Sequence, residues 1–435
     1  MKKIIGLLLV LFCLTNLFAQ VNGELTVENN QKFLRIWGTH AERGYAQGFL
    51  LGDNIMDVFE NYLVAYTFSD NANFYNNAIQ IVTNNFTFDE RYVAEMEGIL
   101  LGMTDSGTNL FVETLNRYVN IDDLKLINSL IDLSGFFSRN ENFQGKFGCS
   151  SLVSWGDSTL EDPILQGEIV ISRLLDWATH PSLVANSIFV IHEPSEADEQ
   201  KWVSFTYPSL IGGLTAINES KVYTELNMGN YADCDSSSFH SILLDTRTGI
   251  ERSDYNQDSV CNAEDVWNSV NDQIHSSGFV ILVANPTIEV NPAFYIEVNN
   301  LEIERRTIED NITLHGNNIA STNHFRELYK PVYCSRYTSL SNSTSNDSTL
   351  TIEENFNILI DCCGLDSNMM TIQYIPSLNE IRWSNFGDFP AYQEDLFTYD
   401  LELLFNLGTQ DISQENIPEY SNNISTFPNP FNPET

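Results

Sequence analysis

The spacing of apolar residues changes at Phe147, and this change constrains the fold more than any other feature of the chain. Between about residues 39 and 140, apolar side chains recur at helical spacing. After Phe147 they form short β-type runs bounded by turn residues. Runs of strands separated by helical blocks favour an α+β protein with antiparallel sheets over alternating βαβ units. We therefore expect a mainly helical segment followed by a strand-rich domain.

The helical segment contains two local signals. Thr39 and Glu42 have the spacing of a capping box, which predicts that a helix starts there. In that helix Gly44 and Gly48 stand four residues apart, a spacing that lets a second element approach closely. Other elements of this segment are predicted as an initial strand at 20–36 and helices at 89–103 and 121–133.

The strand-rich part begins with the run after Gly148. Its later strands are expected at 164–177, 187–192, 202–207, 214–217, 222–226, 241–245, 279–284 and 294–304, with a helix at 263–274. A loop rich in Ser, Asn and Thr at 339–348 separates these strands from one or two further helices.

The first residues differ from the rest of the chain. Residues 1–19 combine Lys2 and Lys3 with an apolar run and a small-residue cleavage site, which is typical of a secretory signal peptide. The apolar run is too short for a stable membrane anchor. We therefore expect an exported bacterial protein in the periplasm, on the cell surface or outside the cell.

The last residues also stand apart. Residues 411–435 read as a linker followed by the string FPNPFNPET, from Phe427 to Thr435. This string resembles the opening of the C-terminal sorting domain of proteins exported by the bacterial type IX secretion system. The strands of such a domain do not follow, so we expect a truncated domain start. The resemblance implies the type IX secretion machinery as a partner.

Acidic residues dominate the charge. Asp and Glu number 59 against 21 Lys and Arg, and the formal net charge is −38. Such a field repels phosphate backbones, so no nucleic acid is expected as a partner. Cysteine spacing predicts neither a disulfide framework nor a zinc site among the six cysteines beyond the signal, Cys149, Cys234, Cys261, Cys334, Cys362 and Cys363.

Cys149 is the first candidate for chemistry. Gly148 precedes it, and an alternating apolar run follows. If the Gly148–Cys149 bond were cut, Cys149 would carry both a thiol nucleophile and an α-amine able to act as its base. A cysteine after a glycine is, by itself, more often a buried structural thiol. The Gly148–Cys149 sequence is therefore compatible with a catalytic nucleophile and with a buried structural thiol.

Arg173 and Asp176 could serve such a nucleophile. A guanidinium stabilises a thiolate, and a carboxylate orients an amine. Residues three apart on a strand face opposite ways, so their convergence requires a strand end or a bulge. The competing interpretation is a surface ion pair.

Three more polar residues could complete a site. Asn227 follows a predicted hairpin turn and is a candidate oxyanion donor. Asn323 could supply a second polarising amide, and Arg336 a charge near the amine. The competing interpretation is an ordinary turn or strand-end residue, and we interpret the neighbouring His324 as structural.

Taken together, these residues and the segment 38–48 resemble the N-terminal-nucleophile (Ntn) hydrolases of the acyl-coenzyme A:6-aminopenicillanic acid acyltransferase family. That family is related to acid ceramidases and choloylglycine hydrolases. The resemblance covers roughly residues 35–405. It implies a four-layer αββα sandwich with two antiparallel sheets at 149–410, preceded by a mainly helical pro-segment at 20–148 that is cleaved from residue 149 on activation.

The resemblance also implies roles for the residues. Cys149 would be the nucleophile and Asn227 the oxyanion donor; the remaining members of the site would be Arg173, Asp176, Asn323 and Arg336. Two departures from the family are visible. Arg173 lies further from Cys149 than in shorter relatives, and Leu174 and Leu175 stand where some relatives have a polar residue.

The implied activity is that of a secreted, self-cleaving hydrolase or acyltransferase. It would act on a small-molecule acyl amide or acyl thioester through an acyl-enzyme on Cys149, with no catalytic cofactor. Two alternatives stay open: a non-enzymatic secreted surface protein that keeps the fold, and a ceramidase-like lipid amidase.

A second motif predicts a structural calcium site. The loop 254–265 has oxygen-bearing residues at the spacing of a calcium loop with a following helix and resembles the dockerin version. Serine replaces the usual glycine at its sixth position, which makes the sharp turn harder. An acidic surface loop is the equal alternative. The candidate ligands are Asp254, Asn256, Asp258, Val260, Asn262 and Asp265.

Overall fold

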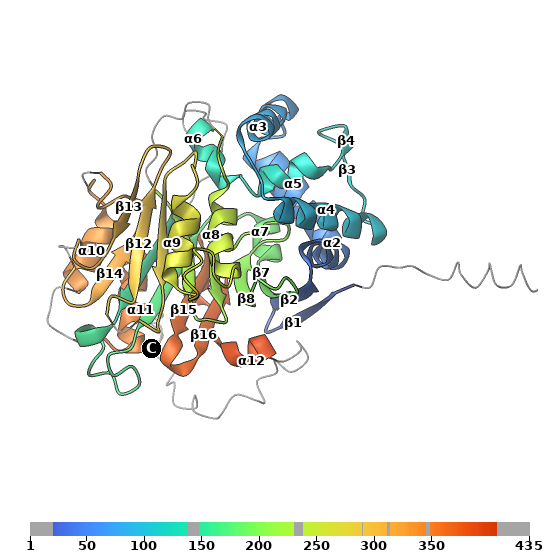
Figure 1. Cartoon of the computed structure of the whole chain (residues 1–435). Helices are drawn as coiled ribbons and strands as arrows, with labels where there is room; N and C mark the ends of the chain where they lie inside the picture. The colour runs from blue at the N-terminus through green and yellow to red at the C-terminus, as the bar shows by residue number, and fades with distance from the viewer. Residues whose placement is uncertain are drawn as a thin grey trace, which may run out of the picture.

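The computed structural model describes residues 21–137, 148–229, 238–288, 290–310, 314–329, 331–344 and 349–406 (Figure 1). The predicted signal peptide, the predicted linker and sorting segment, and Cys234 lie outside these residues, so they stay predictions. Residues 138–147, which lead to the Gly148–Cys149 bond, also lie outside them.

The larger of two main sheets has nine strands. All neighbouring pairs are antiparallel except β2 and β7, which run parallel with Lys32 opposite Ile188. The strand order is β1 (Gly23–Glu28), β2 (Gln31–Gly38), β7 (Ile188–Pro194), β8 (Trp202–Thr206), β9 (Thr215–Asn218), β10 (Tyr223–Met228), β11 (Phe279–Ala284), β12 (Ala293–Val298) and β13 (Ile303–Arg306).

The second sheet has six strands and is antiparallel throughout. Its strand order is β14 (Asn318–Ser321), β5 (Gly148–Ser154), β6 (Val170–Asp176), β15 (Asn368–Ile375), β16 (Glu380–Asn385) and β17 (Phe397–Asp400). The strand that starts at the Gly148–Cys149 bond is therefore an inner strand, paired on both sides.

The two sheets pack face to face through aromatic side chains. Trp383 of the six-stranded sheet contacts Phe33 and Phe189 of the nine-stranded sheet, and Tyr223 stacks on Tyr374. Because helices cover the opposite faces, the central strands are buried on both sides and read as nearly continuous apolar runs, as in β11.

Helices α8 (Ile242–Glu251) and α9 (Ala263–Asn271) contact strands of the nine-stranded sheet. Helices α10 (Ser335–Ser343) and α11 (Ile352–Cys363) cover the six-stranded sheet, where Leu340 and Leu359 pack on Leu152 and Leu174. The prediction of a mixed α+β protein with two main sheets is confirmed.

The N-terminal segment adds more than helices. Its strands β1 and β2 extend the nine-stranded sheet, and its other elements lie together at one end of the molecule (Figure 1). These are α2 (His40–Asp57), the π-helical η1 (Val58–Thr67), α3 (Ala72–Asn85), α4 (Glu90–Asp105), the hairpin β3 (Phe111–Val112) and β4 (Arg117–Tyr118), α5 (Ile121–Ile127) and α6 (Ser134–Phe137).

Both local signals of this segment are confirmed. The Thr39 side chain accepts from the Glu42 amide while the Glu42 carboxylate accepts from the Thr39 amide, which is the predicted capping box. A Cβ on Gly44 would lie 1.9 Å from the Glu95 carbonyl oxygen, so α2 and α4 touch at their backbones. Gly48 makes the same approach to Ile99.

Five sequence predictions about elements are wrong. The single strand expected at 20–36 is the hairpin of β1 and β2, and residues 339–343 of the loop expected at 339–348 belong to helix α10. Residues 241–245 start helix α8, with Ser241 at its N-cap, because the short apolar run there belongs to one face of a helix. The strand expected at 164–177 begins only at Val170. The strand expected at 294–304 is a hairpin of β12 and β13, turned at 299–302.

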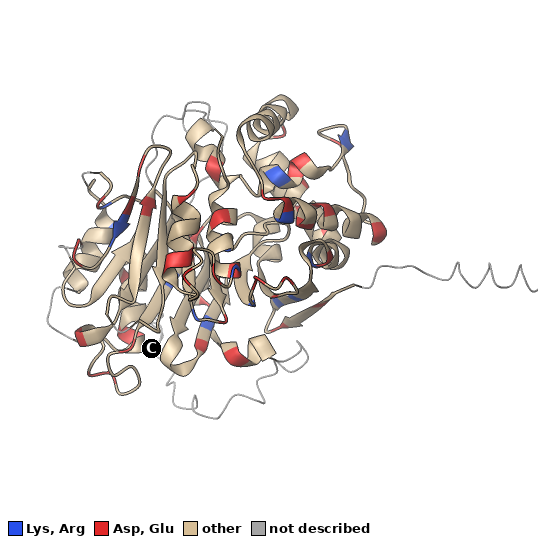
Figure 2. Cartoon of the chain, viewed as in Figure 1, with Lys and Arg blue, Asp and Glu red and all other residues tan. Residues whose placement is uncertain are grey.

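The surface charge follows the composition. Asp and Glu are spread over helices and loops on the face in view, with Lys and Arg sparse among them (Figure 2). Among the described residues, each helix is either too short or too polar to cross a lipid bilayer.

The two short helices of the described chain not named above are α7 (Pro181–Asn186) and α12 (Leu401–Asn406).

Candidate active site

Cys149 lies near the start of β5, opposite Leu175 of β6, and is 2% exposed. Its backbone N–H donates to the Asn323 side-chain oxygen at 3.1 Å. The Arg173 guanidinium donates to its sulfur at 3.8 Å. The structure therefore surrounds the thiol with the groups that a sulfur anion and a developing amine need.

Arg173 is anchored from the other sheet. Its guanidinium donates to the Leu226 carbonyl at 2.8 Å and lies 3.7 Å from the Glu225 carboxylate, with both side chains fully buried. Arg173 and Glu225 are a buried ion pair that water does not reach. Contacts with the protein therefore hold the two side chains in position. The arginine is thus fixed between the sheets with one edge toward the Cys149 sulfur.

Asp176 reaches the site from the end of the same strand. The pairing of β6 with β15 shifts register between Asn368 and Met370, which is the irregularity that the separation of Arg173 and Asp176 required. A methyl group on Gly148 would lie 3.2 Å from an Asp176 carboxylate oxygen. The carboxyl is therefore beside the Gly148–Cys149 bond, where a glycine leaves it room.

Arg336 connects the remaining members. From α10 it donates to the Asn323 side-chain oxygen at 2.7 Å and to the Cys149 carbonyl at 3.3 Å. Its guanidinium also lies 3.7 Å from the Asp176 carboxylate. One arginine thus contacts the amide, the carboxyl and the backbone of the cysteine.

Asn227 belongs to the same cluster through its backbone neighbours. Arg173 binds the carbonyl before it, and the Asn323 side-chain nitrogen donates to the Met228 carbonyl at 3.1 Å. The Asn227 side-chain nitrogen donates to Ser321 at 2.5 Å, which leaves it a second hydrogen. The structure therefore brings all six predicted site residues together, from three strands, one loop and one helix.

His324 does not share this network. Its pKa is lowered by burial and by the charges of Arg326 and Arg336. Its Nδ1 is buried without a hydrogen-bond partner among the described residues. A neutral imidazole with no described bond to Cys149 agrees with the interpretation of this histidine as structural.

In the uncut chain, burial favours the uncharged forms of both the Cys149 thiol and the Asp176 carboxyl. Burial raises the pKa of the Cys149 thiol to about 12, against the lowering effect of the Arg173 guanidinium. Burial also raises the pKa of the Asp176 carboxyl to about 7, although Arg336 lowers it. A protonated thiol beside a carboxyl that ionises near neutral pH is a donor and acceptor pair for proton transfer.

Several polar atoms of the site have no hydrogen-bond partner although they are buried. Such atoms are rare in folded proteins because each costs roughly 1–3 kcal/mol. They belong to the residues that cluster at Cys149, and a substrate or a new α-amine would give them partners. These atoms are one oxygen of Asp176, the side-chain oxygen of Asn227, two nitrogens of Arg173 and one oxygen of Glu225.

Sequence reasoning missed two carboxylates that hold the site. Glu225 pairs with Arg173, as described above. Glu297, on β12, is fully buried and accepts the backbone N–H groups of Arg326, Glu327 and Leu328 at 2.9 to 3.0 Å. This fixes the loop that starts at Asn323. Neither residue has a local sequence signal, because each partner is remote in sequence.

The predicted calcium loop uses most of its described oxygens internally, although one Asp254 oxygen is buried without a hydrogen-bond partner. Asp265 accepts backbone N–H groups from Tyr255, Asn256 and Asn262, and caps α9. Asp258 accepts from the Val260 amide. Because the closing carboxylate already serves as a cap, the described arrangement does not fit a calcium ion, and calcium binding stays a prediction for metal analysis after dialysis.

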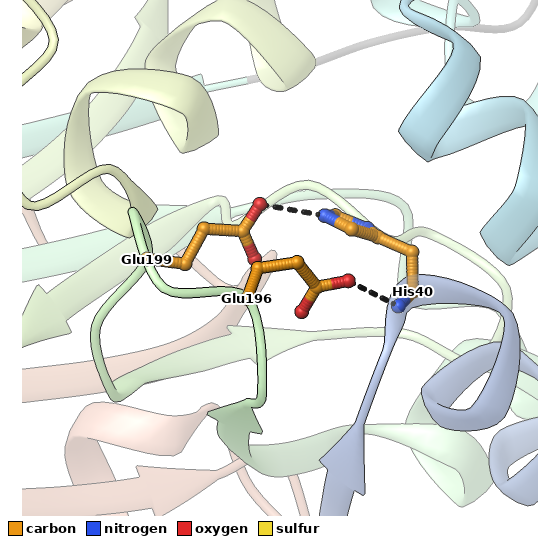
Figure 3. A group of neighbouring side chains, drawn as sticks. All are labelled: His40, Glu196 and Glu199. Carbon is orange, nitrogen blue, oxygen red and sulfur yellow. Dashed lines mark hydrogen bonds and ion pairs between the residues drawn. The ribbon is translucent and has the colours of Figure 1, made fainter.

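A separate buried cluster lies where α2 meets the loop after β7 (Figure 3). His40 Nδ1 lies 2.7 Å from Glu95 and Nε2 2.9 Å from Glu199, and ligand atoms of His40, Glu196 and Glu199 lie within 4.8 Å of one another. We call this group the His40 network. Its members are His40, Arg43, Arg91, Glu95, Glu196, Glu199, Arg247 and Glu251.

The balance of positive and negative side chains in the His40 network argues against a bound metal ion. Burial alone would lower the pKa of His40, but hydrogen bonds to Glu199 and Glu95 outweigh it and raise the pKa to about 9. Arg247 donates to Glu95 at 2.7 Å, and Arg43 to Glu251 at 2.7 Å. An imidazolium and three guanidiniums already balance the four carboxylates.

Comparison with known proteins gives distant structural likenesses only. No protein-family model matches the chain, and no curated protein matches it. A penicillin V acylase from Agrobacterium tumefaciens is 10% identical with a TM-score of 0.41, and the match covers 61% of this chain and 89% of that one.

Two other solved structures are similar at the same level. An N-acylethanolamine-hydrolyzing acid amidase ortholog from Caenorhabditis elegans is 12% identical, with a TM-score of 0.35 and coverage of 53% and 94% of the two chains. A conjugated bile acid hydrolase from Clostridium perfringens is 7% identical, with a TM-score of 0.36 and coverage of 60% and 95%. Such TM-scores are too low to assign this chain an activity.

Proposed function

We propose that this protein is a self-cleaving cysteine amide hydrolase or acyltransferase of the Ntn type, with Cys149 as nucleophile. The observation that supports the proposal most is the convergence of Arg173, Asp176, Asn323 and Arg336 on the Cys149 thiol and its backbone nitrogen. The layering of two sheets between helices agrees with an αββα sandwich.

The first reaction would be cleavage of the chain. The Cys149 sulfur attacks the Gly148 carbonyl carbon, the Gly148–Cys149 C–N bond breaks, and the thiol proton passes through Asp176 to the departing nitrogen. This leaves Gly148 as a thioester on the sulfur. Water then hydrolyses the thioester, which yields a Gly148 carboxylate, a free thiol and a new α-amine on Cys149.

The second reaction would use the new terminus. The α-amine occupies the place where the Cys149 N–H meets Asn323, and it accepts the thiol proton; Arg173 stabilises the resulting thiolate. The thiolate attacks the carbonyl of an acyl amide or thioester. Asn227 donates to the oxyanion, the leaving amine or thiol takes the proton, and water or an acceptor amine removes the acyl group.

Location and partners are part of the same proposal. The signal peptide and sorting segment predicted from the sequence support export through a type IX system, and self-cleavage would activate the enzyme. The names of the similar solved enzymes describe hydrolases of acyl compounds, which agrees with a small-molecule acyl amide as substrate.

Trapping the acyl-enzyme tests the activity. Purified protein is incubated with a panel of acyl amides and acyl thioesters, quenched in acid and analysed by peptide mass spectrometry. We expect an acyl adduct on the peptide that begins at Cys149, and none in Cys149→Ala protein. Cys261→Ala protein, which lacks a different partly buried thiol, is the matched control and should keep the adduct. Hydrolysis that survives Cys149→Ala would refute the proposal.

A further inference from the structure

An apolar cavity lies between the N-terminal segment and the catalytic sheets. Its volume is about 40 Å³, and no charged side chain lines it. The N-terminal segment contributes Val58, Tyr62 and Leu130 among others, whereas Trp177, Tyr207 and Leu210 come from beyond the Gly148–Cys149 bond. The cavity therefore requires both parts of the chain.

The cavity is next to the nucleophile. Cys149 pairs with Leu175 and Gly148 with Asp176, so the cavity residue Trp177 directly follows the site residue that faces the scissile bond. Burial, and after it the neighbouring Tyr62 and Cys149, raises the pKa of Tyr207, which lies in one apolar cluster with Cys149. Cys149 does not itself line the cavity, but Trp177 directly follows Asp176, so the cavity lies close to the site.

One polar atom in the wall lacks a partner. The Tyr207 hydroxyl is buried and makes no hydrogen bond of good geometry among the described residues, although the Ser187 side chain lies near enough to lower its pKa. A buried hydroxyl normally has a partner, because leaving it unpaired costs free energy. The polar end of a substrate, at the junction of an apolar acyl group and its carbonyl, would supply that partner.

The N-terminal segment builds this cavity and also fixes its far wall. Asn128 donates to the Ser209 carbonyl and accepts the Ile211 N–H, both at 2.9 Å. Gln47 accepts the Ser209 N–H at 3.0 Å. The loop that carries Tyr207 and Leu210 is therefore held from both ends by residues that precede the cleavage bond.

From these observations we infer that the enzyme selects a short apolar acyl group, held in this cavity by both fragments of the cleaved chain. The inference rests on the proposed function of Cys149. A cavity needs about 10–15 Å³ to hold one water molecule, so a volume of about 40 Å³ accommodates only a few small apolar groups. A short acyl chain fits this volume, and a fatty acyl chain exceeds it.

Acyl-length profiles test the inference. The substrates are amides of 7-amino-4-methylcoumarin with straight acyl chains of two to twelve carbons. We expect kcat/KM to peak at four or five carbons and to fall at least about tenfold by eight, since one methylene in a fitted pocket changes it by 10-fold or more. Leu130→Ala widens the cavity and should move the peak toward longer chains.

The control is Leu133→Ala, which truncates a buried leucine three residues away that does not line the cavity. It should leave the length profile unchanged. Equal profiles for wild-type and Leu130→Ala protein, or a peak at twelve carbons, would overturn the inference while Cys149-dependent hydrolysis still supports the proposed function.

A binding measurement covers the case in which no amide is hydrolysed. Calorimetric titration of Cys149→Ala protein with butyramide and dodecanamide should show binding of butyramide only. Binding of neither compound would overturn the cavity inference independently of catalysis.

Discussion

The chain contains two buried polar clusters of opposite kind, the His40 network and the Cys149 site. In the His40 network each ionic side chain meets a partner of opposite charge, and the network connects helices of the N-terminal segment to α8 and the loop after β7. At Cys149 more buried atoms lack a hydrogen-bond partner than in the His40 network, where Arg43 Nε and one Glu196 oxygen do, and burial raises the pKa values of Cys149 and Asp176.

The difference separates a structural role from a chemical one. Substituting one member of a balanced buried ion pair lowers stability, because it leaves the other charge buried without a partner. Unpaired buried atoms and shifted pKa values are typical of sites that await a substrate. The His40 network therefore fastens the N-terminal segment to α8 and the loop after β7, and the Cys149 site is where we propose that the chemistry takes place.

The largest expected effect comes from Arg173. Arg173→Met removes the donor to the Cys149 sulfur and should lower kcat/KM by about 10²–10³, as for loss of an electrostatic stabiliser. It also leaves Glu225 unpaired in the interior, so the free energy of unfolding should fall by about 3–5 kcal/mol. Amide hydrolysis and urea titration measure the two effects.

A double variant separates the two effects of Arg173. Arg173→Met/Glu225→Gln should recover most of the lost stability, because no buried charge is left alone, and it should remain inactive. Recovery of activity in the double variant would contradict the role of the guanidinium at the sulfur.

The His40 network should respond to pH through stability alone. The folded pKa of His40 is raised to about 9 from an ordinary value of 6.5, so its stabilising contribution is complete below pH 6.5 and is lost as pH rises through 9. The loss corresponds to about 3 kcal/mol. His40→Gln should flatten that part of the stability curve, measured by urea unfolding between pH 6 and 10.

Asp176 should respond to pH through rate. Its carboxyl is protonated below a pKa of about 7 in the uncut chain, and only the carboxylate can accept the thiol proton. Self-cleavage should accelerate about tenfold per pH unit up to pH 7 and level off above it. Asp176→Asn protein should cleave slowly at every pH, and a retained inflection near 7 would exclude Asp176 as the acceptor.

The smallest expected effect comes from Glu297. Glu297→Gln weakens the acceptor of three backbone N–H groups, so the loop bearing Asn323 should shift, and it leaves the buried Arg306 without its charge partner, so stability should also fall. We expect kcat to fall about tenfold with KM unchanged, because a small displacement of a positioned group affects the transition state most. The exposed Glu302→Gln is the control, and an unchanged kcat would limit Glu297 to stability.

Sequence reasoning succeeded where partners are near in the chain or chemically distinctive. The capping box of Thr39 and the close approach at Gly44 follow from local spacing, and both are present. The six site residues were identified by chemistry and resemblance, and the fold brings them together. It failed for Glu225, whose partner Arg173 lies in the other sheet, and for Glu297, whose backbone partners lie in a loop remote in sequence.

Two larger features were equally invisible in the sequence. The parallel pairing of β2 with β7 makes the N-terminal segment part of the nine-stranded sheet. No local sequence pattern predicts a pairing between residues as far apart as Lys32 and Ile188. The apolar cavity likewise depends on side chains from both sides of Gly148. If the chain is cut at Gly148–Cys149 as proposed, both features predict that the described N-terminal residues 21–137 stay bound to the rest of the protein.

The most direct test is the mass and N-terminal sequence of the purified protein under denaturing conditions. Cleavage predicts two fragments for wild-type protein, the larger one starting at Cys149, and one uncut chain for Cys149→Ala. In native solution the two wild-type fragments should elute together. A single uncut wild-type chain, or a cut at any other bond, would contradict the account of Cys149 as the nucleophile exposed by its own reaction.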